Sequence, residues 1–303
     1  MGLKKSDANW TTFCWEGFEV EVPADWELGA ASGGYESGYI RLDDPDMVRF
    51  EMRWEKARGK VTAKDVVDNH IKQAEKEAKR SGQNVKTKRD LSLIRLEGCD
   101  CECFSFDAEL QSFGLVRRCG ECKRNVFARV MYRKGEPMRK VAQRLFESLR
   151  DHPSGEGVNW RFFGFAFESP VGMRLKERSL KTGCLEMLFT RGKDELEYAR
   201  VSLAGLQLQK KKLKAWFEEF YNKRLRAYRC RSKEEIFRGH KSLAYTGEAK
   251  LLRPITTLLR LRRDLWARVW WCEESDKLFV FRATAKAKQM SEYAKFVETI
   301  RCH

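Results

Sequence analysis

Residues 144–152 read RLFESLRDH, and residues 295–303 read KFVETIRCH. Each segment follows a basic, strand-like run, VFARVMYRK or LFVFRATAK, and each ends on a histidine, His152 or His303. Similarity at two places half a chain apart indicates a duplication, because repeated units show themselves as self-similarity at a fixed spacing. We therefore expect two domains, residues 1–152 and 153–303.

The beginnings of the two halves also match. FEVEVPADWEL (18–28) corresponds to FAFESPVGMRL (165–175), which aligns Pro23 with Pro170. Alternating, strand-like segments follow in both halves, then a helical segment at 62–80 or 209–228, further strand-like runs and a closing amphipathic helix. This order predicts an α+β protein in which an antiparallel β-sheet is flanked by helices, twice in tandem.

The expected helix at 209–228 carries an apolar stripe at helical spacing. Its members are Leu213, Trp216, Phe217, Phe220 and Leu225. Such a stripe is typical of a helix face that packs on a core.

This order of elements resembles the PsbP-like fold, which is shared by photosystem extrinsic proteins and the Ran GTPase release factor. The residues that carry the resemblance are Phe18, Val20, Pro23, Trp26, Phe146 and Leu149 in the first half, and Phe165, Phe167, Pro170, Met173, Phe296 and Ile300 in the second. Met173 departs from the aromatic residue of the pattern. The resemblance implies an α/β/α sandwich in each half, and a binding or accessory role in place of catalysis.

The positive charge lies mostly in the second half. The chain has 60 Lys and Arg against 44 Asp and Glu, a net charge of +16. Residues 1–152 hold 28 basic and 26 acidic side chains, a net of +2, whereas residues 153–303 hold 32 and 18, a net of +14. Clustered Lys and Arg neutralise phosphates, so this imbalance favours nucleic acid or a ribonucleoprotein as the partner. An acidic protein surface or acidic lipid headgroups would fit the same charge.

The basic residues concentrate in two stretches, 209–233 and 251–268. The candidate polyanion-binding side chains are Lys210, Lys211, Lys212, Lys214, Arg224, Arg226, Arg229, Arg231, Arg260, Arg262 and Arg263. Nearby aromatic side chains could stack on bases, namely Tyr228, Trp266, Trp270 and Trp271. The alternative is a solvated basic face above aromatic core residues.

Five of the ten cysteines fall between positions 99 and 122. Cys99, Cys101 and Cys103 alternate, so they share one face of a strand, and a hairpin turning near residues 109–112 would place Cys103 opposite about Cys119. Cys122 completes a C-x-x-C pair. Four of these five thiolates could hold one structural zinc, because tetrahedral zinc takes four ligands. Reduced core thiols and a redox disulfide are the alternatives.

The second half does not repeat these cysteines. At the matching positions it has His240, Ser242, Ala244, Val269 and Cys272, so the fold itself does not require them. The other cysteines, Cys14, Cys184, Cys230, Cys272 and Cys302, are expected to be small apolar core residues.

Little in the chain points to catalysis. The four histidines, His70, His152, His240 and His303, have no obvious nucleophile partner, and the glycine-rich stretch 29–38 lacks the lysine of a phosphate loop. We expect a non-catalytic binding or accessory protein of the cytoplasm, monomeric with internal pseudo-symmetry and without a transmembrane segment. A protein–protein interaction adaptor without nucleic-acid binding is the first alternative. An enzyme or redox protein that uses the cysteines is the second.

Overall fold

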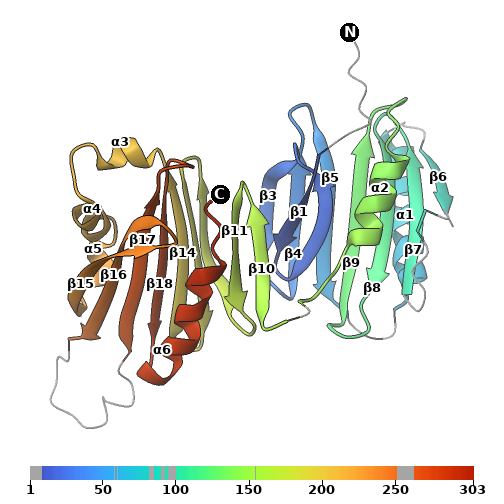
Figure 1. The fold of residues 1–303 in the computed structure, drawn as a ribbon. Coiled ribbons are helices and arrows are strands. Elements are labelled where there is room, and N and C mark those ends of the chain that lie inside the picture. The colour runs from blue at the N-terminus through green and yellow to red at the C-terminus, as the bar shows by residue number, and fades with distance from the viewer. Residues whose placement is uncertain are drawn as a thin grey trace. The chain divides into compact units, whose positions relative to one another are not determined.

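The computed structural model describes residues 9–57, 59, 61–81, 85–89, 93–94, 100–153, 155–250 and 263–303. The chain divides into two compact units, which Figure 1 traces from blue to red. The first unit consists of Met1–Gly155 with Asn159–Gly164, and the second of Glu156–Val158 with Phe165–His303.

Besides most of β10 (Gly157–Phe162), the first unit contains further strands and helices. They are β1 (Trp10–Trp15), β2 (Phe18–Pro23), β3 (Glu27–Gly33), β4 (Ser37–Asp43), β5 (Val48–Lys56), α1 (Ala63–Ser81), β6 (Lys86–Arg89), β7 (Asp100–Asp107), β8 (Gln111–Arg118), β9 (Arg124–Tyr132) and α2 (Arg139–Ser148). Seven of the strands form one antiparallel sheet in the order β3-β4-β5-β9-β8-β7-β6. Strand β1 pairs with β2 and, at Cys14 and Arg161, with β10 (Gly157–Phe162).

The second unit repeats this order of elements. They are β11 (Phe165–Pro170), β12 (Arg174–Lys181), β13 (Cys184–Arg191), β14 (Asp194–Ser202), α3 (Ala204–Leu208), α4 (Leu213–Phe220), α5 (Asn222–Leu225), β15 (Tyr228–Phe237), β16 (His240–Ala249), β17 (Asp264–Cys272), β18 (Lys277–Ala285), α6 (Ala287–Ala294) and the 3₁₀ helix η2 (Lys295–Thr299). Its sheet has the order β12-β13-β14-β18-β17-β16-β15. The two seven-stranded sheets therefore correspond strand by strand.

The expected α/β/α sandwich is wrong. The described residues are mostly β, with 53% strand and 22% helix, and the large sheets are antiparallel. Helix α4 has eight residues and spans roughly 12 Å. Seven strands about 4.8 Å apart extend across roughly 29 Å. The helices of the second unit are thus too short to form a layer over its sheet. No helix of the described residues is long and apolar enough to cross a membrane.

The single helix expected at 209–228 is divided into α4 and α5. Lys212, just before α4, is extended (φ −68°, ψ 155°). The N-terminus of a helix carries a partial positive charge, so the lysines at 210–212 oppose a helix that would begin there. Tyr221 separates the two helices with φ −103° and ψ 14°. Its side chain is buried, as are Trp216 and Phe217, whereas Phe220 is 37% exposed.

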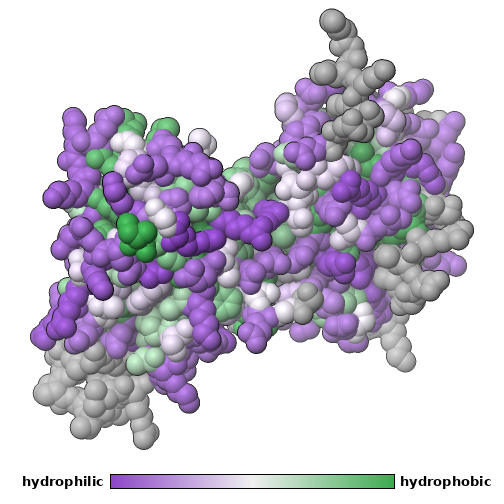
Figure 2. Space-filling model, in the orientation of Figure 1, coloured by the Kyte–Doolittle hydropathy of each residue, from purple (hydrophilic) through white to green (hydrophobic). Residues whose placement is uncertain are grey.

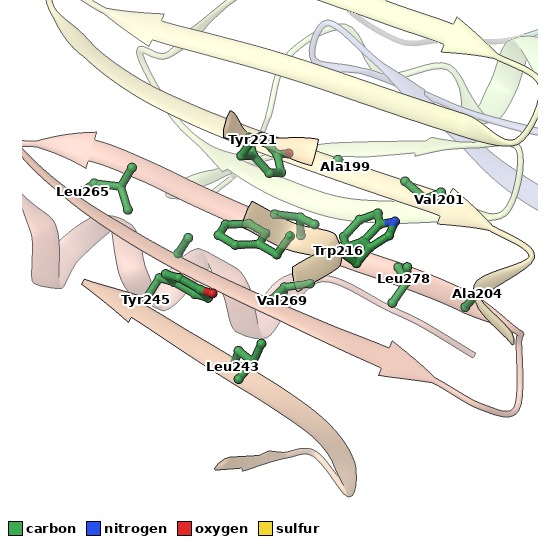
Figure 3. Close-up of a cluster of buried hydrophobic side chains, with 13 residues drawn as sticks. Ala199, Val201, Ala204, Trp216, Tyr221, Leu243, Tyr245, Leu265, Val269 and Leu278 are labelled. Atoms are coloured by element: carbon green, nitrogen blue, oxygen red, sulfur yellow. The ribbon is translucent and has the colours of Figure 1, made fainter. Parts of the chain in front are cut away.

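The core of the second unit lies between α4 and the sheet (Figure 3). Trp216, Phe217 and Tyr221 pack against apolar side chains of the strands. These are Leu243 and Tyr245 of β16, Leu265, Ala267 and Val269 of β17, Leu278 and Val280 of β18, and Ala199 and Val201 of β14. Odd-numbered residues of β16 and β17 therefore face α4, and the even-numbered ones face the other side of the sheet.

The first unit uses its long helix in the same way. Ala63, Val67 and Ile71 recur every fourth residue along α1 and are buried. They pack on Phe104 and Phe106 of β7 and on Val116 of β8. This helix agrees with the segment expected from sequence at 62–80 within one residue at each end.

Candidate binding groove

A groove of about 880 Å³ lies in the second unit, where α4 leaves the end of the sheet uncovered. One wall is the chain from Leu208 to Lys214, which joins α3 to α4. The floor comes from Glu234–Ile236 of β15, Lys241–Leu243 of β16 and Trp271 of β17.

The floor of the groove includes an exposed apolar side chain. Ile236 is 70% exposed, although it stands on a strand. The register pairs it with Lys241 and pairs Glu234 with Leu243, so all four side chains lie on the face that α4 covers. Trp271 packs partly on the core at the same end. On the face drawn in Figure 2, hydrophilic side chains predominate and strongly apolar ones form small patches among them.

Lysines surround this floor. Lys210, Lys211, Lys212, Lys214 and Lys241 all line the groove. Lys211 pairs with Glu219 at 2.6 Å, and Lys214 is 4.0 Å from Glu218. For Lys210, Lys212 and Lys241 there is no ion pair within the described part of the chain, and Glu235 is held by Arg268 at 2.6 Å. The lining therefore has an excess of positive charge.

The wall is held in place by the start of α3. Leu203 adopts a left-handed conformation, φ 59° and ψ 46°, and is 60% exposed. Asp276 anchors the turn, because its carbonyl accepts from Ala204 N at 3.1 Å and its carboxylate accepts from Gly205 N at 2.7 Å. These contacts fix the point from which the lysine segment departs.

The predicted polyanion-binding residues do not all lie on one surface of the second unit. Lys210, Lys211, Lys212 and Lys214 come together at the groove. Arg229 and Arg231 are exposed on β15, but they alternate with Ile236 and so lie on the opposite face of the sheet.

Of the other predicted arginines, the three that the structure describes have partners of their own. Arg224 pairs with the buried Glu197, and Arg263 pairs with Asp194 at 3.1 Å. Arg226 donates to Asn222 at 3.0 Å. Arg260 and Arg262 lie outside the described residues.

Three of the four aromatic residues expected to stack on bases have partners of their own. Trp270 is 1% exposed and stacks on Phe279 at 5.4 Å between ring centroids. Trp266 contacts Phe281 edge-on, and Tyr228 packs on the core. Trp271 alone of the four lines the groove.

The register of β7 and β8 determines where the first-unit cysteines lie. Cys101 pairs with Arg117, and Cys103 pairs with Leu115. Cys103 thus lies four residues away from the position opposite Cys119 that the sequence suggested. Burial raises the pKa of Cys103 to about 12, with smaller effects from Cys101 and Glu102. Cys99 lies outside the described residues.

Cys119 has partners other than those predicted. Its Sγ, an oxygen of Asp151 and a ring nitrogen of His152 lie within 4.8 Å of one another and could hold a metal ion. Cys122 Sγ lies 3.4 Å from Asp151 Oδ2. Burial, followed by the hydrogen bond to Asp151, raises the pKa of Cys119 to about 11. The spacing of the cysteines alone did not reveal the contribution of residues 151 and 152.

Comparisons with known proteins add little to this geometry. No family model matches the chain, and no curated protein matches it. The chain is similar to the T6SS immunity protein TplEi of Pseudomonas aeruginosa, which was solved in complex with an "L" peptide. The two are 12% identical, the match covers 97% of this chain and 99% of that chain, and the TM-score is 0.36. A structure from Bacteroides thetaiotaomicron VPI-5482 shows 15% identity over 48% of this chain and 50% of that chain, with a TM-score of 0.26. Neither description names a PsbP-like protein, so that resemblance stays a prediction.

Proposed function

We propose that the protein is a non-catalytic binding protein whose second unit holds an acidic polypeptide segment in the lysine groove. The observation that supports this proposal is the exposed Ile236 in a groove that five lysines also line. A segment with alternating acidic and apolar side chains would pair its carboxylates with the lysines and bury the isoleucine. Fully burying such a side chain contributes roughly 1.5–3 kcal/mol.

An acidic polypeptide suits the groove better than nucleic acid does. Trp271 is the one predicted stacking residue in the lining, and the remaining three have ring or core partners elsewhere in the unit. Glu234 in the lining would repel a phosphate backbone. A polypeptide can place a lysine or a neutral residue beside Glu234, whereas every nucleotide brings a phosphate.

Charge reversal within the groove tests this proposal. In the full chain, we expect the triple variant Lys210→Glu, Lys212→Glu and Lys241→Glu to bind a labelled peptide of alternating glutamate and leucine about 10- to 100-fold more weakly. Fluorescence anisotropy measures the affinity. Ile236→Ser should weaken binding of the same peptide without changing how strongly the affinity depends on salt.

The matched control reverses three charges on the opposite face of the same strand. Arg229→Glu, Arg231→Glu and Lys233→Glu change the net charge by the same amount and leave the groove intact. Equal weakening by both triple variants would show a diffuse charge effect and contradict the groove. If the control variant loses more affinity for single-stranded RNA than the groove variant does, the nucleic-acid prediction is favoured instead.

Two other expectations remain proposals. The absence of catalysis rests on the sequence, and an enzymatic or redox role for the cysteines is its alternative. Zinc in the first unit would use Cys119 with Asp151 and His152, which the sequence did not single out as ligands, because thiolate and imidazole ligands suit zinc.

A further inference from the structure

Two cysteines and two histidines meet on the face of the second sheet opposite the groove. His240 begins β16 and Cys272 ends β17. Cys302 and His303 follow η2 along the chain. The ligand atoms of these four residues all lie within 4.8 Å of one another.

The distances between these atoms fit a tetrahedral metal. Zinc bonds sulfur at about 2.3 Å and imidazole nitrogen at about 2.0–2.1 Å, so at a tetrahedral angle the two ligands lie about 3.5 Å apart. Cys302 Sγ is 3.4 Å from His240 Nε2 and 3.5 Å from His303 Nδ1. Cys272 Sγ is 3.4 Å from His303 Nδ1. Each ring presents one nitrogen toward the sulfurs.

Surrounding groups hold the ligands in this arrangement. Glu274 approaches the second nitrogen of His303, with Oε2 and Nε2 3.5 Å apart, as carboxylates commonly do behind metal-bound histidines. Arg238 donates to the carbonyl of Ile300 at 2.8 Å and so ties residues 300–303 to the β15–β16 turn. Cys272 is fully buried, whereas the His303 side chain is 44% exposed, so an ion can enter from solvent.

The first unit has a related cluster of three residues, Cys119, Asp151 and His152, at the corresponding place. Cys119 N donates to Arg124 O across the β8–β9 turn, as Cys272 pairs with Lys277 across the β17–β18 turn. Lys123 and Asp276 occupy equivalent turn positions with φ 58° and 48°. The chain then returns through equivalent bridges, Arg150 with Glu19 and Arg301 with Ala166.

These equivalences align Cys119 with Cys272, Asp151 with Cys302 and His152 with His303. Both units therefore place a cysteine and a histidine together at this point of the fold, with one further acidic or thiol ligand beside them. The alignment by turns also differs from the sequence comparison, which matched Cys122 with Cys272. Cys122 instead corresponds to Ser275.

We propose that His240, Cys272, Cys302 and His303 bind one zinc ion. The two thiols lose their protons on binding, and two thiolates with two neutral imidazoles give a neutral site around Zn²⁺. Four protein ligands leave no open position, so the ion is structural. It fastens residues 300–303 to the ends of β16 and β17, independently of the groove on the other face.

Metal titration of the full chain tests this site. Protein freed of metal by a chelator and desalted is titrated with Zn²⁺ against a chromophoric chelator, and with Co²⁺ for its absorption spectrum. We expect tight binding and the thiolate charge-transfer and tetrahedral d–d bands of cobalt. Cys302→Ser and His240→Gln should each remove one equivalent or weaken it by about 100-fold or more, since changes beyond the ligands already cost 10- to 100-fold.

Two controls separate this site from the others. Cys230→Ser removes an exposed thiol of the same unit and should leave the metal content and spectrum unchanged. Cys119→Ser tests the first unit. The proposal is overturned if Cys302→Ser and His240→Gln take up as much zinc as the unchanged chain, if Cys119→Ser alone abolishes binding, or if no metal binds. Peptide binding in the groove is measured separately, so either proposal can fail alone.

Discussion

His70 illustrates how the fold changes the chemistry of a single residue. Its ring lies among Phe104, Phe106 and Phe127, with the nearest centroid 4.4 Å away. Burial lowers the pKa of His70 below its ordinary 6.5, Arg129 and Arg53 lower it further, and Glu77 opposes them. The side chain that the sequence left without a role therefore packs against aromatic residues of the first unit.

This environment makes stability depend on pH. Below pH 6.5 the unfolded chain binds a proton at His70 that the folded chain resists, so stability is lost as the pH falls from there through the folded pKa. We expect the unchanged protein to lose more free energy of unfolding between pH 7.5 and 5.5 than His70→Gln does. Urea denaturation at both values measures the difference. Equal losses would mean that His70 has the same pKa in the folded and unfolded chains, which would contradict the effect of its burial.

At the scale of elements, the sequence predicted strands and the long helix better than it predicted the site. Alternation identified strands such as β5, where Met52 and Trp54 are buried and Arg53 is exposed, and the apolar spacing identified α1. The helix expected at 209–228 begins only at Leu213, because three consecutive lysines before it oppose the helix dipole. The cysteine hairpin was misplaced by four residues, since a short turn fixes a register that alternation alone leaves open.

The His–Cys cluster of the second unit escaped sequence analysis for a similar reason. Its members lie at the ends of different elements, and Cys272 and Cys302 are separated by the whole of β18, α6 and η2. No short spacing joins them. The matching ends RDH and RCH of the two halves were the available signal, because they bring a histidine to the same place twice.

Leu203, the residue just before α3, provides a prediction at this scale. Leu203 has a positive φ and gains little from burial, and the left-handed conformation costs an ordinary residue about 1–2 kcal/mol. After the entropy cost of glycine is subtracted, we expect Leu203→Gly to stabilise the protein by about 0.5–1 kcal/mol. Leu206→Gly, equally exposed but inside α3, should destabilise it by about 1 kcal/mol. Chemical denaturation measures the stability of both variants. A Leu203→Gly variant no more stable than the unchanged protein would contradict the strain at Leu203.

At the scale of the whole molecule, a duplicated β-rich framework carries two different surfaces. The halves share their strand order, but the second carries a net charge of +14 and the first +2. Five lysines of the second unit line a groove on one face of its sheet together with the exposed Ile236, and the His–Cys cluster occupies the other face. The two units thus share a strand order while the charge of their halves differs.

The most direct test of this account is a binding comparison on the full, unchanged chain. A labelled peptide of alternating glutamate and leucine and a single-stranded RNA of equal charge are titrated at the same salt concentration, near physiological. We expect the peptide to bind more tightly, because only the peptide can bury Ile236 while it neutralises the surrounding lysines. Tighter binding of the RNA, or no binding of the peptide, would contradict the proposed groove.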